Sequence, residues 1–219
     1  MIIRESFTAP PWNRGEIARY ARAKADDERI AALIDECIRE AEPVLDYRVC
    51  YTVCDIVRQD RIITFDGIVA RSDTLSKALS GCEKLALFAA TVGAPFDRLI
   101  ARYSRLEPSK ALMMQAIGAE RVESLCDAFC AKLNTELIAD KKAMRTRVSP
   151  GYGDIPLEMQ RDIFKALDCE RKIGLTLNES LLMSPSKSVT AIAGIGVARC
   201  EQPEEKCTSC QKTDCVYRR

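Results

Sequence analysis

The sequence contains no histidine. This absence excludes Ser-His and Cys-His catalysis, imidazole metal ligands and the general base that enzymes use most often. The chain also lacks a basic excess, because its 33 lysines and arginines face 32 acidic residues. Proteins that bind nucleic acid normally carry such an excess. We therefore expect no nucleic-acid partner.

Long hydrophobic runs and an export signal are missing as well. The first residues, MIIRESFTAPPW, contain no apolar core of a signal peptide. The longest apolar run, LALFAATVGA at 85–94, is too short to cross a bilayer. We therefore expect a cytoplasmic protein without a membrane partner. With 219 residues, 47% of them hydrophobic, the chain can still bury a sizeable core.

Helical and strand patterns both occur, and they do not alternate strictly, which favours an α+β fold. We expect helices at 13–43, 72–81, 94–106, 109–140 and 157–168. We expect strands at 47–57, 61–67, 84–93 and 188–199, the first two of which form a hairpin. The long helix should bury one stripe of side chains: Val122, Leu125, Phe129 and Leu133.

The segment RTRVSPGYGDIP, residues 145–156, has a composition that neither a helix nor a strand favours. Pro150 fixes the backbone, while Gly151 lets it approach a ligand closely. Arg147 presents a planar fork of donors that suits a carboxylate. Tyr152 adds an aromatic face and a hydroxyl. The loop therefore predicts a site for an amino-acid-like ligand with an aromatic or cationic group, and an ordinary surface turn is the alternative.

This loop resembles a motif of the activation domain of cobalamin-dependent methionine synthase. The motif consists of an arginine, three residues, Gly-Tyr and a proline a few positions on. Upstream, FAATVG at 88–93 is similar to the end of a strand in the family, and downstream, 162–189 is similar to its next segment. The positions that carry the resemblance are Arg147, Gly151, Tyr152, Pro156, Ile173, Gly174, Glu179, Ser180, Met183, Pro185, Ser188 and Val189, with Asn178 in place of a threonine.

The resemblance spans roughly 83–198 and implies the family's fold. That fold is α+β, with a central, mainly antiparallel twisted sheet and flanking helices. We expect residues 1–82 to form N-terminal helices and a β-hairpin packed on the main domain. Residues 83–199 would form the ligand-binding core, and 200–219 a cysteine-rich tail.

The family's activation domain binds S-adenosylmethionine (AdoMet) and presents its methyl group to a cobalamin held elsewhere. By resemblance, Arg147 holds the carboxylate of the methionine part. An acidic residue on the long helix lies near the amino group. Glu123 is the best match, and Asp127, one helical turn further on, remains an alternative. Four loop residues would line the ligand: Ser149, Pro150, Gly151 and Tyr152.

The sequence also departs from the family. It has no methyltransferase or cobalamin-binding module, no histidine-bearing cobalamin loop, and no aromatic residue soon after Ser188-Val189. The resemblance therefore implies a free-standing accessory protein without a catalytic side chain of its own, which meets cobalamin only through a partner. It would support the reductive remethylation of a corrinoid methyltransferase. Methionine synthase, an enzyme of methionine biosynthesis, is one candidate for that methyltransferase. Two alternatives are a non-catalytic module that senses AdoMet or binds a corrinoid protein, and an iron–sulfur electron donor.

The C-terminal tail is rich in cysteine, which accounts for 11 residues in the whole chain. Four thiols within 200–215 suit tetrahedral zinc or a 4Fe–4S cluster, whereas reduced surface thiols are the alternative. Without an export signal, a metal site is favoured over disulfides. The expected ligands are Cys200, Cys207, Cys210 and Cys215.

Overall fold

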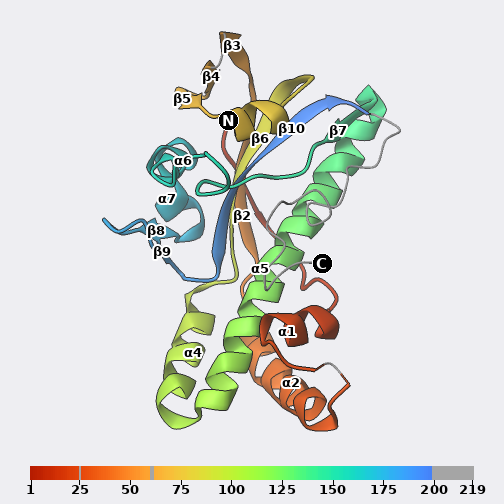
Figure 1. The fold of residues 1–219 in the computed structure, drawn as a ribbon, viewed down its shortest axis with the longest axis vertical. Helices are drawn as coiled ribbons and strands as arrows, with labels where there is room; N and C mark the ends of the chain where they lie inside the picture. Colours follow the sequence, from red (N-terminus) through yellow and green to blue (C-terminus); the bar gives the residue numbers. More distant parts are fainter. Residues whose placement is uncertain (25, 60–61, 199–219) are drawn as a thin grey trace.

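The computed structural model describes residues 1–24, 26–59 and 62–198. Five strands form one antiparallel sheet in the order β1-β2-β6-β10-β7. Helices cover both faces of this sheet (Figure 1), which confirms the α+β class and the antiparallel central sheet. The strands are β1 (Ile3–Ser6), β2 (Arg48–Asp55), β6 (Cys82–Thr91), β10 (Ser188–Val197) and β7 (Lys142–Met144).

One face of the sheet packs against the longest helix. This helix, α5 (Pro108–Leu137), has 30 residues and contacts three others. The buried stripe predicted for it is confirmed, because Val122, Leu125, Phe129 and Leu133 are at most 6% exposed. The three neighbours are α1 (Arg14–Tyr20), α2 (Glu28–Ala41) and α4 (Ala94–Leu106), and short 3-10 turns lie at Glu42–Val44 and Ile138–Asp140.

The opposite face of the sheet carries a second core. On β6, Phe88 packs towards α5, whereas Leu85 and Leu87 pack into this second cluster. The cluster is closed by three helices and a small sheet. They are α3 (Asp73–Ala78), α6 (Met159–Leu167), α7 (Cys169–Ile173) and the strands β3 (Val57–Gln59), β4 (Ile62–Phe65) and β5 (Ile68–Arg71). A two-stranded ribbon, β8 (Thr176–Leu177) and β9 (Met183–Ser184), lies beside α6.

Two predictions for the N-terminal half were wrong. The helix expected over 13–43 is interrupted after Tyr20, and α2 begins anew because the Asp27 side chain caps it by accepting a hydrogen bond from Arg29 N. Most of the strand expected over 47–57 does not pair with 61–67, so the expected hairpin does not form. Its first part is β2, which pairs with β6, and only β3 pairs with β4. Five strands were not predicted: β1, β5, β7, β8 and β9.

The expected division of the chain at residue 82 stays a prediction. Strands β1 and β2 are hydrogen-bonded into the same sheet as β6 and β10. The tail expected to hold a metal, 200–219, lies outside the described residues. Within the described ranges, none of the helices combines the length and apolar character needed to cross a membrane.

Candidate functional site

The loop singled out by its composition is anchored on the central sheet. After β7 the chain returns to β10, where Val148 N donates to Ile192 O at 2.9 Å and Ile192 N donates to Val148 O at 2.8 Å. The loop closes on itself where Gly151 N donates to Ile155 O at 2.9 Å. Gly151 has a φ of +84°, a value that favours glycine. The sheet and this closure together fix the path of the loop.

The far end of the loop is fixed by the N-terminus of α3. Asp154 Oδ1 accepts hydrogen bonds from Ser72 Oγ at 2.6 Å and Thr74 N at 3.0 Å, and Asp154 Oδ2 accepts one from Asp73 N at 2.7 Å. These donors, Ser72 first, hold the pKa of the Asp154 carboxyl well below its usual range. Gly153 lies so close that an added Cβ would be 2.4 Å from Thr74 Oγ1.

Arg147 reaches from the loop to the middle of α5. Its Nη2 lies 2.6 Å from Glu123 Oε2, and its Nη1 lies 2.5 Å from Asp127 Oδ1. The Arg147 side chain is 20% exposed. Burial lowers the pKa of the guanidinium, but the carboxylates of Glu123 and Asp127 help to raise it, so Arg147 remains charged. The two acidic residues that the sequence left as alternatives therefore both contact the same arginine.

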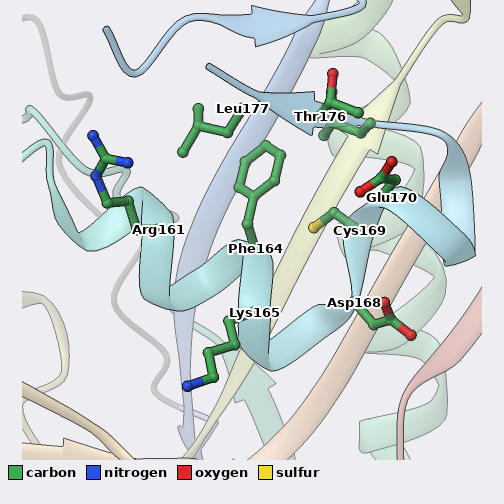
Figure 2. A pocket seen from close by; sticks show the side chains of 9 residues that line it. Arg161, Phe164, Lys165, Asp168, Cys169, Glu170, Thr176 and Leu177 are labelled. Atoms are coloured by element: carbon green, nitrogen blue, oxygen red, sulfur yellow. The ribbon is translucent and has the colours of Figure 1, made fainter. Parts of the chain in front are cut away.

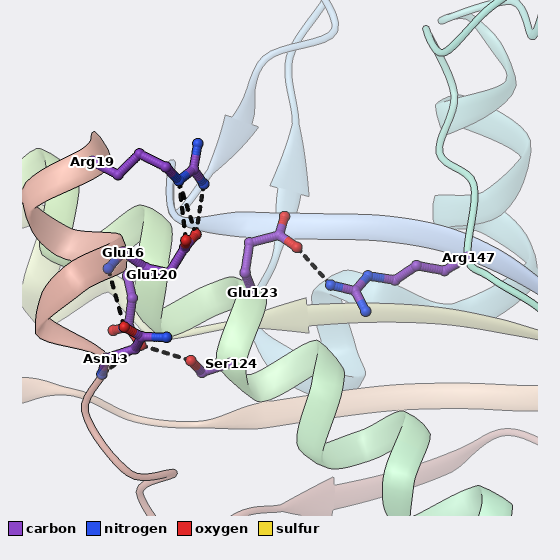
Figure 3. A network of polar contacts seen from close by, with 7 residues as sticks. All are labelled: Asn13, Glu16, Arg19, Glu120, Glu123, Ser124 and Arg147. Carbon is purple, nitrogen blue, oxygen red and sulfur yellow. Dashed lines mark hydrogen bonds and ion pairs between the residues drawn. The ribbon is translucent and has the colours of Figure 1, made fainter. Parts of the chain in front are cut away.

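Helix α1 borders this arrangement on the other side of Glu123 (Figure 3). Tyr20 has a raised pKa, first because it is buried and then because of the charge on Glu123. The guanidinium of Arg19 lies 4.4 Å from the centre of the Tyr20 ring and binds Glu16 in an ion pair. The sequence analysis did not predict that α1 borders the site, because no local pattern indicates contact between α1 and Glu123, about a hundred positions later.

The segment before α1 is held to α5 by Arg121, a residue of α5 that also forms a buried ion pair with its neighbour Glu120. Arg121 and Glu120 are paired with side chains that are 0% and 2% exposed. The Arg121 guanidinium lies 3.9 Å from the centre of the Trp12 ring and donates to the carbonyl oxygens of Pro10 and Pro11 at 2.7 and 2.8 Å. These contacts fix the entry to α1, and with it one border of the site.

Comparison with known proteins identifies the family. A family model described as "Vitamin B12 dependent methionine synthase, activation domain" matches residues 23–198, which is more than half of the chain. The chain belongs to this family. A solved structure described as the MetH reactivation domain bound to AdoHcy is similar, with a TM-score of 0.65 and 16% identity, over 89% of this chain and 78% of that chain. That likeness shows the fold, and no curated protein matches the sequence.

In this member of the activation-domain family, the predicted loop residues have different exposures. Pro150 is buried, Ser149 is half-buried, and Tyr152 is 50% exposed. Gly151 is exposed as well. The described part of the chain contains no group of three or more cysteine, aspartate or glutamate residues placed to hold a metal. The four tail cysteines lie outside the described residues.

A separate hollow of about 440 Å³ lies on the opposite face of the sheet (Figure 2). It is formed by α6, α7 and β8, and none of the predicted ligand-binding residues lines it. Its lining includes the apolar side chain of Phe164, the thiol of Cys169, and the charged side chains of Arg161 and Glu170. The family resemblance points to the Arg147 loop instead, so we place the candidate site there.

Proposed function

We propose that this chain binds AdoMet at the Arg147 loop and presents its methyl group to the cobalamin of a separate corrinoid methyltransferase protein. The observation that carries the proposal is the position of Arg147. In a chain of the activation-domain family, this arginine extends from the Pro-Gly loop to acidic residues at the middle of α5. A guanidinium fork beside carboxylates matches both charges of an amino-acid head group.

Each proposed site residue has a specific role. The Arg147 fork binds the ligand's carboxylate, and Glu123 binds its ammonium group. The backbone of Ser149, Pro150 and Gly151 approaches the ligand, which rests against the ring of Tyr152. Since the loop is held by β10 and by α3, its backbone path is set before the ligand arrives.

The chemistry requires orientation and no acid or base from this chain. AdoMet supplies an activated methyl group on its sulfonium, and the partner's reduced cobalt supplies the nucleophile. The Arg147 loop would hold the sulfonium at the surface, where a second protein can approach it. This assignment suits a chain without histidine, and the protein would act as one component of a cobalamin-dependent methyltransferase system.

We further propose that the tail binds one metal centre, either zinc or a 4Fe–4S cluster. Four thiols within 200–215 can supply all the ligands of either centre: Cys200, Cys207, Cys210 and Cys215. Metal binding would order a polar segment that has few apolar residues to pack.

The AdoMet assignment is tested by calorimetry on wild type, Arg147→Ala and Arg147→Lys. We expect Arg147→Ala to lose about 2–5 kcal/mol of binding free energy, because it removes one partner of a mostly buried charged pair. Arg147→Lys should recover only part, since a point charge does not reproduce the fork. Arg145→Ala is the matched control, because Arg145 donates to Val197 O and not to α5. Unchanged affinity in folded Arg147→Ala contradicts the assignment.

The proposed role is tested by adding the chain to a corrinoid methyltransferase with a strong reductant and AdoMet. We expect the cobalt to be methylated faster when the chain is present, as recorded by the absorption spectrum of the corrinoid. The Arg147→Ala variant should lose this effect. An equal rate with and without the chain favours the non-catalytic alternative, in which the protein only senses AdoMet or binds the corrinoid protein.

A further inference from the structure

The Arg147 fork already holds two carboxylates of its own chain. Glu123 contacts one terminal nitrogen at 2.6 Å and Asp127 contacts the other at 2.5 Å. A ligand carboxylate at the same guanidinium would be a third negative charge beside these two, so we expect it to compete with them for the fork. Glu123 and Asp127 lie one turn apart on α5, and their side chains differ in exposure to solvent.

We propose that Asp127 is an internal substitute for the ligand's carboxylate, which the ligand displaces while Glu123 stays to bind the ligand's ammonium group. This inference rests on the proposed function, since it assumes that an AdoMet-like ligand binds at Arg147. It adds a residue that sets specificity and states the ligand class: a nucleoside joined to a zwitterionic amino-acid head group.

Exposure determines which carboxylate leaves. The Asp127 side chain is 70% exposed, so water solvates its carboxylate at little cost once it is released. Glu123 is 44% exposed and lies between Arg147 and Tyr20 of α1. If Glu123 keeps its place, its carboxylate faces the ammonium group of a ligand bound next to the fork. Glu123 then strengthens ligand binding, whereas Asp127 weakens it by competing for Arg147.

Burial of Arg147 favours an acceptor at both ends of its fork. Its side chain is 20% exposed, so a terminal nitrogen that loses its acceptor is only partly solvated, even while Glu123 stays at the other end. In the absence of ligand, Asp127 supplies this acceptor at one end of the fork. A ligand without a carboxylate cannot replace that charge and leaves Asp127 in place. Arg147 thus favours ligands with a carboxylate over ligands without one, because only the former can replace Asp127.

The experiment compares two neutral ligands that share the nucleoside. S-adenosylhomocysteine (AdoHcy) carries the zwitterionic head group, whereas 5′-methylthioadenosine carries none. Calorimetry is performed on wild type, Asp127→Asn and Glu123→Gln. We expect Asp127→Asn to bind AdoHcy about two- to fivefold more tightly, the range that one exposed ion pair contributes. Its affinity for methylthioadenosine should not change. Glu123→Gln should bind AdoHcy about tenfold more weakly, because the ammonium loses a charged acceptor.

Glu136→Gln is the matched control. It removes a half-exposed carboxylate that pairs with Lys132 on the same helix, so AdoHcy affinity should stay as in wild type. Weaker or unchanged AdoHcy binding by Asp127→Asn overturns the inference and leaves the proposed function standing, provided that wild type binds AdoHcy. If neither wild type nor Asp127→Asn binds AdoHcy or AdoMet, the proposed function fails and the inference fails with it. Binding by Asp127→Asn alone supports both.

Discussion

The carboxylate of Asp154 accepts a hydrogen bond from the Ser72 hydroxyl at 2.6 Å, although 82 positions separate the two residues. Ser72 also caps α3, because its side chain accepts a hydrogen bond from Leu75 N. One serine thus links the start of a helix to the end of the candidate ligand loop. The loop geometry depends on α3 as well as on the loop's own turn residues.

The stability that this hydrogen bond contributes should fall at acidic pH. Hydrogen bonds from Ser72 and its neighbours lower the pKa of Asp154 in the folded protein, so the stability they provide is complete above the ordinary aspartate pKa of about 3.9. It is lost as the pH falls below that value through the lowered pKa. We expect Asp154→Asn to unfold in less urea than wild type at pH 7, and the gap to narrow below about pH 3.9. A gap that stays constant down to pH 2.5 contradicts this assignment.

Gly153 should not tolerate a side chain. Its φ is +61°, and an added Cβ would meet Thr74 Oγ1 at 2.4 Å. We expect Gly153→Ala to lose about 1–3 kcal/mol of unfolding free energy and to weaken AdoMet binding. Gly67→Ala is the control, because Gly67 has a φ of +77° but nothing within 4 Å of its Cβ. The excess loss in Gly153→Ala measures the contact with α3, and equal losses would show that there is none.

Arg121 should be essential for stability. Replacing it by methionine leaves the buried Glu120 carboxylate without its ion-pair partner, which costs about 3–5 kcal/mol in urea unfolding. Trp12, the single tryptophan, should report the change by fluorescence, because its ring stacks on Arg121. Asp35→Asn breaks the exposed pair with Arg14 and should cost less than about 1 kcal/mol. Similar losses in the two variants would show that burial does not decide the outcome.

The tail should retain metal through its cysteines. We expect anaerobically purified wild type to contain one metal centre by elemental analysis, and Cys207→Ser with Cys210→Ser to lose it. A zinc protein is colourless, whereas a 4Fe–4S protein is brown. Cys54→Ser, a change on β2, should keep the metal. Stoichiometric metal in the double variant would exclude these two residues as ligands, and AdoMet affinity should change little in either variant.

The helices and strands that local patterns define could be predicted from the sequence. Periodicity placed α5 and its buried stripe, and continuous apolar character placed β6 and β10, because each of these elements is buried along its own length. Residues 47–57 were assigned to a hairpin because a neighbouring strand follows. In the structure Val49 and Cys50 are both fully buried, so this segment belongs inside the central sheet. Pairing with a distant strand has no local signal.

The site shows the same limit. The composition of the loop pointed to Arg147, and the family resemblance added Glu123, but helical spacing could not separate Glu123 from Asp127. Both contact Arg147, because residues four apart on a helix share a face. The link from Asp154 to Ser72 was not predicted, since it joins two segments that come together only in the folded chain.

The order of the central sheet has a consequence for how the chain folds during synthesis. Strand β6 lies between β2 and β10, and Thr91 on β6 pairs with Ser188 on β10, 97 positions later. At a ribosomal rate of about 5–20 residues per second, one edge of β6 stays unpaired for about 5–20 seconds after the strand emerges. An apolar strand with a bare edge is prone to aggregate. We therefore expect the nascent protein to be most prone to aggregate before β10 has left the ribosome.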